Sequence, residues 1–270
     1  MNNSSATVVR NVLIAVLVVI VMIIGGYGIG LGILYWTSGT DSLPVQLGER
    51  PTAAVTTTVL DPTSPTAPTT APPLPENPVN FAEWKAINPD IYAFLEVPGT
   101  PIQYPVACAS DQADGFYLNH NIYREYEFAG TIYSEKKNGT AMADRHTVMY
   151  GHNMLNGTMF ASLHDFEDPA FFEDHDKIYV YTPGHIYTYT IFAAYEYDNR
   201  HLLNAVDYHN DSVWADYLAY AIDPQTMVVN TRDTDVKLTD RILTLSTCVG
   251  WNKSVRYLVQ GVLTDDQLTQ

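Results

Sequence analysis

The stretch ILTLSTCVGWNKSVRYLV, residues 242–259, holds two runs of alternating apolar and polar residues around a short polar segment. A period of two places Ser246 and Cys248 on the same face of the first strand. The intervening segment 249–254 is short enough for a hairpin loop, so the second strand is expected to return antiparallel beside the first. The pattern therefore predicts that Cys248 and Arg256 lie near the same end of one sheet.

A thiol beside a guanidinium is a chemically distinctive pair. The cation favours the thiolate, which is the nucleophilic form of cysteine. The same guanidinium can stabilise the oxyanion that forms when a carbonyl is attacked. From Cys248 and Arg256 alone, a buried structural cysteine and a surface arginine remain the alternative interpretation.

Residues 79–270 have the size of one domain with a sizeable core, and their pattern is mostly β. A tyrosine-rich hairpin is predicted around Pro183 and Gly184. Further predicted strands are TPIQYPV, GTIYSE, HTVMYGH, DRILTLSTC and SVRYLVQGVL. Helical spacing is found at 159–166 and 213–222, and Asn80 with Glu83 predicts a capped helix that ends before Pro89. Short strands with few helices favour a sandwich or barrel with helical insertions.

The N-terminal region predicts a membrane anchor. Residues 12–36 are apolar and uncharged, and they are long enough to span a bilayer as a helix. Arg10 precedes this span, which favours a cytoplasmic stub at 1–11 and an exported body. A cleaved signal peptide is the alternative, although no A-x-A site follows the apolar run.

Residues 37–78 are predicted to be a stalk. Eight of the sixteen prolines fall between Pro51 and Pro78, mixed with threonine and alanine. This composition favours extended conformers over a packed core.

The charge of the chain argues against nucleic-acid binding. Residues 1–78 contain two basic and four acidic side chains out of 14 and 30, so residues 79–270 carry a formal net charge of −14. Such a domain repels phosphate backbones and anionic lipid headgroups.

A nucleophilic cysteine needs a group that transfers protons, and the chain has eight histidines. His146 opens the predicted strand HTVMYGH and His152 closes it. Gly151 is expected to let the backbone turn sharply and present the His152 ring at the sheet rim. The other six, including His164, lie in polar contexts that suggest no chemistry.

Several segments together resemble class B sortases: YGHNM, followed by GTMFASL, then TLSTC with an arginine eight positions after the cysteine. The lead-in segments NPDIYAFLEVPGTPIQYPV, GFYLNHN and AGTIYSE are similar to that family in the same order. The resemblance covers residues 81–263. It implies an eight-stranded sortase-type β-barrel with N-terminal helices. It also implies a long helix between the sixth and seventh strands, which NDSVWADYLAYAI would supply.

The same resemblance implies site residues. Cys248 is the expected nucleophile, His152 the proton-transfer residue and Arg256 the partner of the oxyanion and the substrate carbonyl. Ser246, Tyr150 and Leu118 fall on positions that line the substrate groove. No cofactor and no metal are expected.

The implied function is that of a cysteine transpeptidase anchored in a Gram-positive cell membrane, with its catalytic domain at 79–270 outside. Such an enzyme cleaves the C-terminal sorting motif of a secreted protein through a thioester and joins the acyl group to an amine of peptidoglycan. Pilin polymerisation is the alternative within the family. A stalked surface binding module without chemistry is the alternative from another class.

Two positions depart from the family pattern. Gly250 stands where some class B members carry an aspartate, so no carboxylate that orients His152 can be assigned from the motif. Asp114 stands where asparagine is common, which leaves the specificity of the groove open.

The second cysteine, Cys108, leaves two possibilities open. A Cys108–Cys248 disulfide is one, because exported domains often contain them, and a free buried thiol is the other. A cysteine phosphatase is disfavoured, because seven residues rather than five separate Cys248 from Arg256. A metal site is disfavoured by the lack of C-x-x-C and of a close histidine pair.

Overall fold

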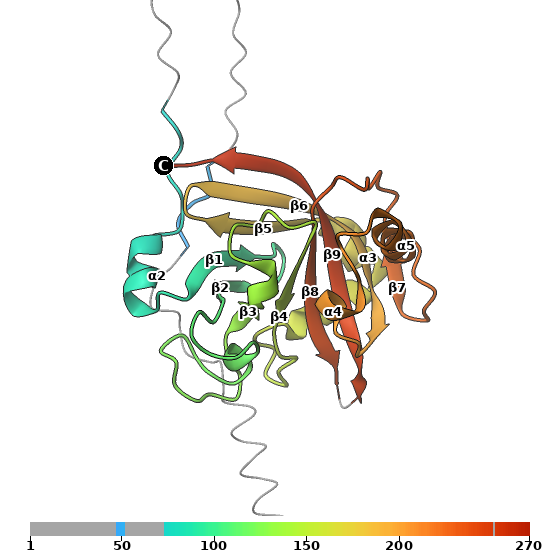
Figure 1. Cartoon of the computed structure of the whole chain (residues 1–270), viewed down its shortest axis with the longest axis horizontal. Coiled ribbons are helices and arrows are strands. Elements are labelled where there is room, and N and C mark those ends of the chain that lie inside the picture. Colours follow the sequence, from blue (N-terminus) through green and yellow to red (C-terminus); the bar gives the residue numbers. More distant parts are fainter. Residues whose placement is uncertain (1–46, 52–72, 251) are drawn as a thin grey trace, which may run out of the picture.

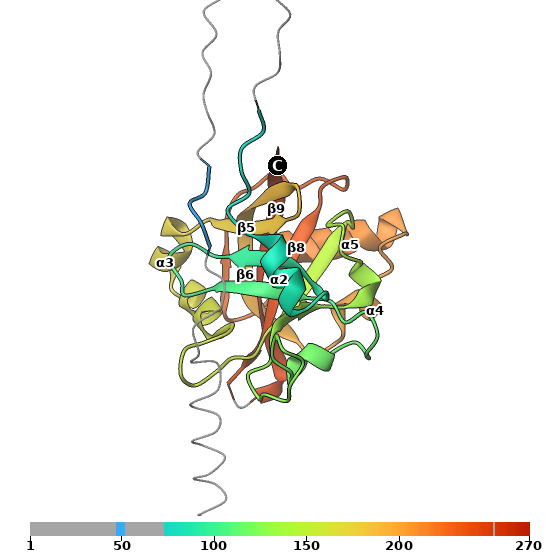
Figure 2. The same ribbon diagram turned by 90° about the vertical axis from the view of Figure 1, so that its left-hand side faces the viewer.

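The computed structural model describes residues 47–51, 73–250 and 252–270, and Figures 1 and 2 show it in two orientations. The predicted cytoplasmic stub and membrane anchor, and most of the predicted stalk, lie outside these residues. In the described ranges, no helix has the length and apolar character needed to cross a membrane.

The domain is a closed β-barrel. Its strands are paired in the order β5-β1-β2-β3-β4-β8-β9-β6, and a pairing between β5 and β6 closes the ring of eight, while β7 extends the sheet beside β6. The strands are β1 (Ile91–Glu96), β2 (Gln103–Ala107), β3 (Ile132–Ser134), β4 (His146–Tyr150), β5 (Lys177–Thr182), β6 (His185–Asp198), β7 (Val229–Thr231), β8 (Ile242–Val249) and β9 (Asn252–Leu268). The predicted eight-stranded barrel is confirmed.

Few helices decorate this barrel. They are α2 (Phe81–Ile87), α3 (Pro169–Asp174), α4 (Leu202–Ala205) and α5 (Asp211–Ile222), together with short 3₁₀ segments that include Ala161–Glu167. The Asn80 side chain caps α2 by accepting from the Glu83 backbone N–H, as the sequence predicts. α5 lies between β6 and β8, the sixth and seventh strands of the barrel, which confirms the expected inserted helix.

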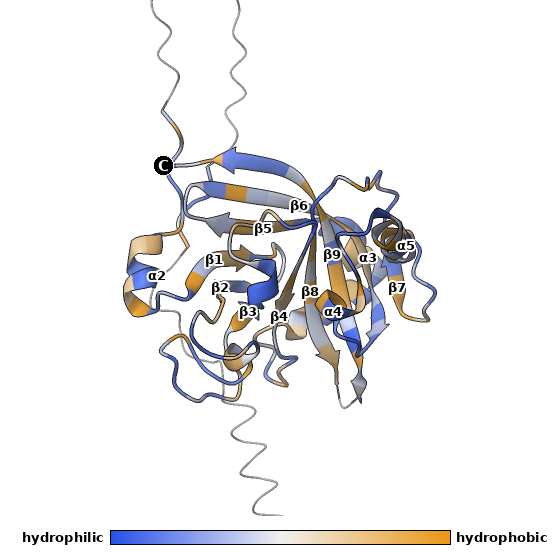
Figure 3. Ribbon diagram, viewed as in Figure 1, coloured by the Kyte–Doolittle hydropathy of each residue, from blue (hydrophilic) through white to orange (hydrophobic). Residues whose placement is uncertain are grey.

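Two hydrophobic clusters occupy the two faces of the sheet. The interior cluster draws side chains from all eight barrel strands and includes Leu243 and Leu245 of β8. The second cluster packs α4 and α5 against the outer face of β4, β6, β8 and β9, and it includes Ile242. The alternation read in residues 242–248 therefore separates the barrel interior from the face beneath α5. In Figure 3, hydrophobic residues lie on the strands and α2, and the connecting loops are mostly hydrophilic.

Strand β1 is absent from the strands that the sequence pattern predicts. All six of its residues are buried, because both faces are covered, so the chain shows no polar alternation there. The run IYAFLE is continuous and apolar except at its end.

The described parts of the predicted stalk contact the barrel. The Arg50 guanidinium bonds both carboxylate oxygens of Glu96 at 2.9 Å and donates to the Tyr181 hydroxyl at 3.0 Å. It also lies 3.4 Å from the centroid of the Tyr179 ring. The Asn77 amide donates to the Thr182 carbonyl at 2.9 Å.

Candidate active site

The hairpin of β8 and β9 brings Cys248 and Arg256 together. The two residues are direct partners in the antiparallel register, so their side chains point to the same face of the sheet. That face is the outer one, beneath α4 and α5. Gly250, just after β8, has a φ of 44°, a left-handed conformation that glycine adopts without strain.

His152 lies at the same end of the neighbouring strand. β4 runs parallel to β8, with Tyr150 opposite Ser246, and the Gly151 N–H donates to the Ser246 carbonyl at 3.2 Å. His152 and Cys248 each follow this pair by two residues. The ends of three adjacent strands therefore carry the imidazole, the thiol and the guanidinium.

The role expected for Gly151 needs a correction. Its φ is not positive, so the left-handed freedom of glycine is not what the position uses. Space decides instead: a Cβ at Gly151 would lie 2.5 Å from the Ile132 side chain and 2.8 Å from the Phe160 ring. Glycine is required because β4 ends against the packed core.

The His152 ring is held by two contacts. Its Nε2 lies 2.9 Å from the Leu118 carbonyl oxygen, and the ring stacks on Phe128 with centroids 5.2 Å apart. A carbonyl only accepts, so Nε2 carries a hydrogen and Nδ1 is the basic nitrogen of the neutral ring. Burial lowers the pKa of His152, against the opposing effect of the Leu118 hydrogen bond, so the neutral imidazole dominates at neutral pH.

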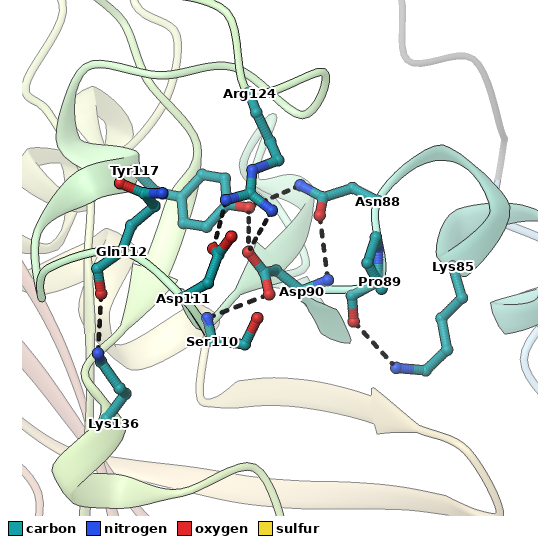
Figure 4. Close-up of polar contacts among 10 residues, drawn as sticks. All are labelled: Lys85, Asn88, Pro89, Asp90, Ser110, Asp111, Gln112, Tyr117, Arg124 and Lys136. Carbon is teal, nitrogen blue, oxygen red and sulfur yellow. Dashed lines mark hydrogen bonds and ion pairs between the residues drawn. The ribbon is translucent and has the colours of Figure 1, made fainter.

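A buried polar network fixes the loop that supplies the Leu118 carbonyl (Figure 4). The Tyr117 hydroxyl donates to the Asp90 carboxylate at 2.7 Å, and the Ser110 N–H donates to the same carboxylate at 3.1 Å. Burial alone would raise the pKa of Asp90, but these hydrogen bonds outweigh it, and the pKa is lowered. Arg124 bridges Asp90 and Asp111 across the loop. The residue before Leu118 is therefore anchored to the start of β1.

The three residues expected to line the substrate groove lie beside the catalytic positions. Ser246 is buried, and Tyr150 opposite it is half-buried. The Tyr150 ring stacks on Tyr133, and its buried hydroxyl finds no hydrogen-bond partner among the described residues. Leu118 is 41% exposed, and it contacts His152 through its carbonyl oxygen.

Sequence reasoning missed two residues that hold the backbone at the nucleophile. The Cys248 carbonyl accepts from His164 Nε2 and from the Asn153 amide, each at 3.1 Å. The His164 ring also stacks on Tyr257 of β9, with centroids 4.9 Å apart. Asn153 follows His152 directly in the motif YGHNM, so its place in the chain was a usable signal. His164 had no such signal.

Both cysteines are free thiols, so the disulfide alternative does not hold. Cys108 is 7% exposed, and burial raises the pKa of its thiol, which makes it a poor nucleophile. Cys248 is partly exposed. Among the described residues, no group of three or more histidine, cysteine or acidic side chains is arranged to hold a metal ion.

Comparison with known proteins identifies the relatives of the chain. Residues 95–264 match the family model described as the sortase domain. Sortase B of Staphylococcus aureus is 31% identical over 168 residues, which cover 62% of this chain and 67% of that protein. Sortase B of Listeria monocytogenes is 32% identical over 162 residues, 60% of this chain and 64% of that protein. The solved structure of Clostridium perfringens sortase B superposes with a TM-score of 0.62 at 32% identity, covering 69% of this chain and all of that one.

Proposed function

Because the chain belongs to the sortase family of cysteine transpeptidases, we propose that it cleaves the C-terminal sorting motif of secreted proteins and transfers the acyl group to an amine of peptidoglycan. The observation that carries this proposal is the direct pairing of Cys248 with Arg256, beside the end of the strand that leads to His152.

The first half of the reaction forms a thioester. The Cys248 thiolate attacks the carbonyl carbon of the scissile amide, and Arg256 stabilises the resulting oxyanion. The C–N bond then breaks, and the departing amine leaves with a proton from the imidazolium of His152. Since Nε2 donates to Leu118, Nδ1 is the nitrogen that delivers this proton.

The second half transfers the acyl group. The incoming amine attacks the thioester carbon, His152 Nδ1 accepts its proton, and the C–S bond breaks to release the Cys248 thiolate. The lowered pKa of His152 suits this step, because the ring must be neutral to accept a proton. Arg256 serves the oxyanion a second time, and loss of one such donor typically costs about 3 kcal/mol of transition-state stabilisation.

Solved structures of relatives include a donor complex and a complex with a short glycine peptide. S. aureus sortase B, 28% identical, is described in a substrate complex, and a sortase B structure at 27% identity is described as complexed with triglycine. Both support a peptide donor and an amine acceptor for this chain. We propose further that residues 12–36 anchor the chain in the membrane, with 1–11 cytoplasmic, 37–78 as the connecting segment and the domain at 79–270 outside.

A second function in the same class is pilin polymerisation. It is favoured by similarity to Spy0129 of Streptococcus pyogenes, described as a class B sortase involved in pilus biogenesis, at 27% identity and a TM-score of 0.59. The two functions differ in the acceptor rather than in the chemistry at Cys248.

The test is cleavage of a library of fluorescent sorting-motif peptides by the wild type and by Cys248→Ala. We expect turnover of at least one motif by the wild type and none by the variant. Added amine should convert the hydrolysis product into an amide product of higher mass. Equal, negligible turnover by both proteins across a broad library would instead favour a binding module.

A further inference from the structure

A groove of about 540 Å³ opens on the outer face of the barrel, beyond the residues assigned above. The end of β6, the start of β9 and one face of α5 form its walls. The lining residues used below are Glu196, Tyr197, Asp198, Asp216 and Tyr220. We call this the α5 groove.

The register places the α5 groove close to the nucleophile. Tyr197 is the direct partner of Arg256, and Arg256 is the direct partner of Cys248, so all three side chains share one face. Two strand spacings of about 4.8 Å separate Tyr197 from Cys248, roughly 10 Å in all. Tyr150 and Ser246 lie on the other side of this row, toward β4. An acyl donor on the β4 side therefore leaves the β6 side open to a second molecule.

The lining of the groove suits a cation. Of its charged side chains, Arg200 is paired with Asp198, and Glu196 and Asp216 have no ion-pair partner within the described part of the chain. The rings of Tyr197 and Tyr220 lie 5.8 Å apart. The Arg200 guanidinium already lies 5.5 Å from the Tyr197 ring centroid, so this ring accepts a cation at its rim.

We propose that the α5 groove binds a cationic side chain of the amine acceptor, a group distinct from the amine that attacks the thioester. The two roles need different groups, because carboxylates stabilise an ammonium ion whereas the attacking amine must be unprotonated. An extended peptide spans about 10 Å in roughly three residues. The acceptor is therefore a peptide with lysine or arginine about three residues from its free amino group. This inference rests on the proposed transpeptidation.

The test compares two acceptor peptides, Gly-Gly-Gly-Lys amide and Gly-Gly-Gly-Gln amide, with the full chain in detergent and a fixed motif peptide as donor. The wild type should use the lysine peptide with a kcat/KM about three- to tenfold higher, which is the scale of partly exposed charge pairs. Glu196→Gln combined with Asp216→Asn should remove the preference and leave donor hydrolysis without acceptor unchanged. Asp235→Asn, an 84% exposed carboxylate away from the groove, is the matched control and should keep the preference.

Equal use of the two peptides by the wild type, or a preference that persists in the double variant, overturns the inference. A second measurement separates this from failure of the proposed function. The Cys248→Ala protein is titrated with each peptide, without any donor. Tighter binding of the lysine peptide that the double substitution removes supports the groove even if no donor is cleaved, and equal binding refutes it.

Discussion

Lowering the pH from 7.5 to 4.5 should weaken the fold through one buried imidazole, that of His146 on β4. Its Nε2 lies 2.6 Å from the Thr244 hydroxyl of β8, and its Nδ1 lies 3.0 Å from the Tyr208 hydroxyl. Tyr208 already donates to the Leu202 carbonyl, so it accepts from His146 Nδ1–H. Nε2 then accepts from Thr244, whose oxygen in turn accepts from the Gln260 amide. The neutral ring satisfies every group in this chain of hydrogen bonds.

Protonation at Nε2 would break that arrangement in a site without solvent. Burial lowers the pKa of His146 to about 3, from 6.5 in an unfolded chain. A lowered folded-state pKa means that the unfolded state binds the proton first. The contribution to stability is therefore complete above pH 6.5 and is lost progressively as the pH falls toward 3.

The size of the effect at pH 4.5 follows from the unfolded pKa. The unfolded imidazole is two pH units below its pKa while the folded ring is still neutral, and each unit corresponds to about 1.4 kcal/mol. The free energy of unfolding should fall by about 2 to 3 kcal/mol from this residue alone. The result is insensitive to the folded value, provided that it stays well below 4.5.

The assay is urea unfolding of the wild type and His146→Gln at both pH values. Acidic side chains contribute equally to the two proteins, so the difference between their pH dependences isolates His146. The reasoning is refuted if the two proteins lose the same free energy between pH 7.5 and 4.5. If the variant does not fold, NMR titration of the wild-type imidazole decides, and a pKa near 6.5 contradicts the account.

Three further predictions concern the connecting segment and the site. Double-mutant analysis of Arg50→Ala and Glu96→Gln should give a coupling of about 1 to 2 kcal/mol in unfolding, because Glu96 is largely buried and the pair is bidentate; a coupling near zero would mean that the segment is not held. A small alkylating reagent should label one cysteine in the folded protein and two after denaturation, with peptide mapping placing the first label on Cys248; rapid labelling of Cys108 would contradict its burial. The acidic limb of the acyl-transfer rate should have its midpoint below pH 6.5, because burial lowers the pKa of His152; a midpoint at or above 6.5 would show that the ring is not desolvated in this way.

The fold was predictable wherever one face of an element meets water. Residues 242–263 alternate because β8 and β9 separate the barrel interior from the face beneath α5, and Asn80 marks the start of α2 by its capping chemistry. β1 carried no such signal, because it is covered on both faces. The docking of Arg50 on Glu96 was equally hidden, because it depends on two residues 46 positions apart.

The site divides in the same way. The placement of Cys248, Arg256 and His152 followed from strand registers that local alternation and short loops determine. The contact of His164 could not be anticipated, because its partner is a backbone carbonyl 84 residues away, brought near only by the packing of the 3₁₀ segment Ala161–Glu167 against β9. The reason for Gly151 was also invisible, since the side chains that crowd it come from β3 and from Phe160.

The central claim is that Cys248 forms a thioester with a sorting-motif peptide, and intact-protein mass spectrometry tests it most directly. The wild type and Cys108→Ala, incubated with a cleavable peptide and quenched in acid, should each gain the mass of the acyl fragment, and hydroxylamine should remove it. Cys248→Ala should gain nothing. An adduct that persists in Cys248→Ala, or one that disappears in Cys108→Ala, would contradict the account.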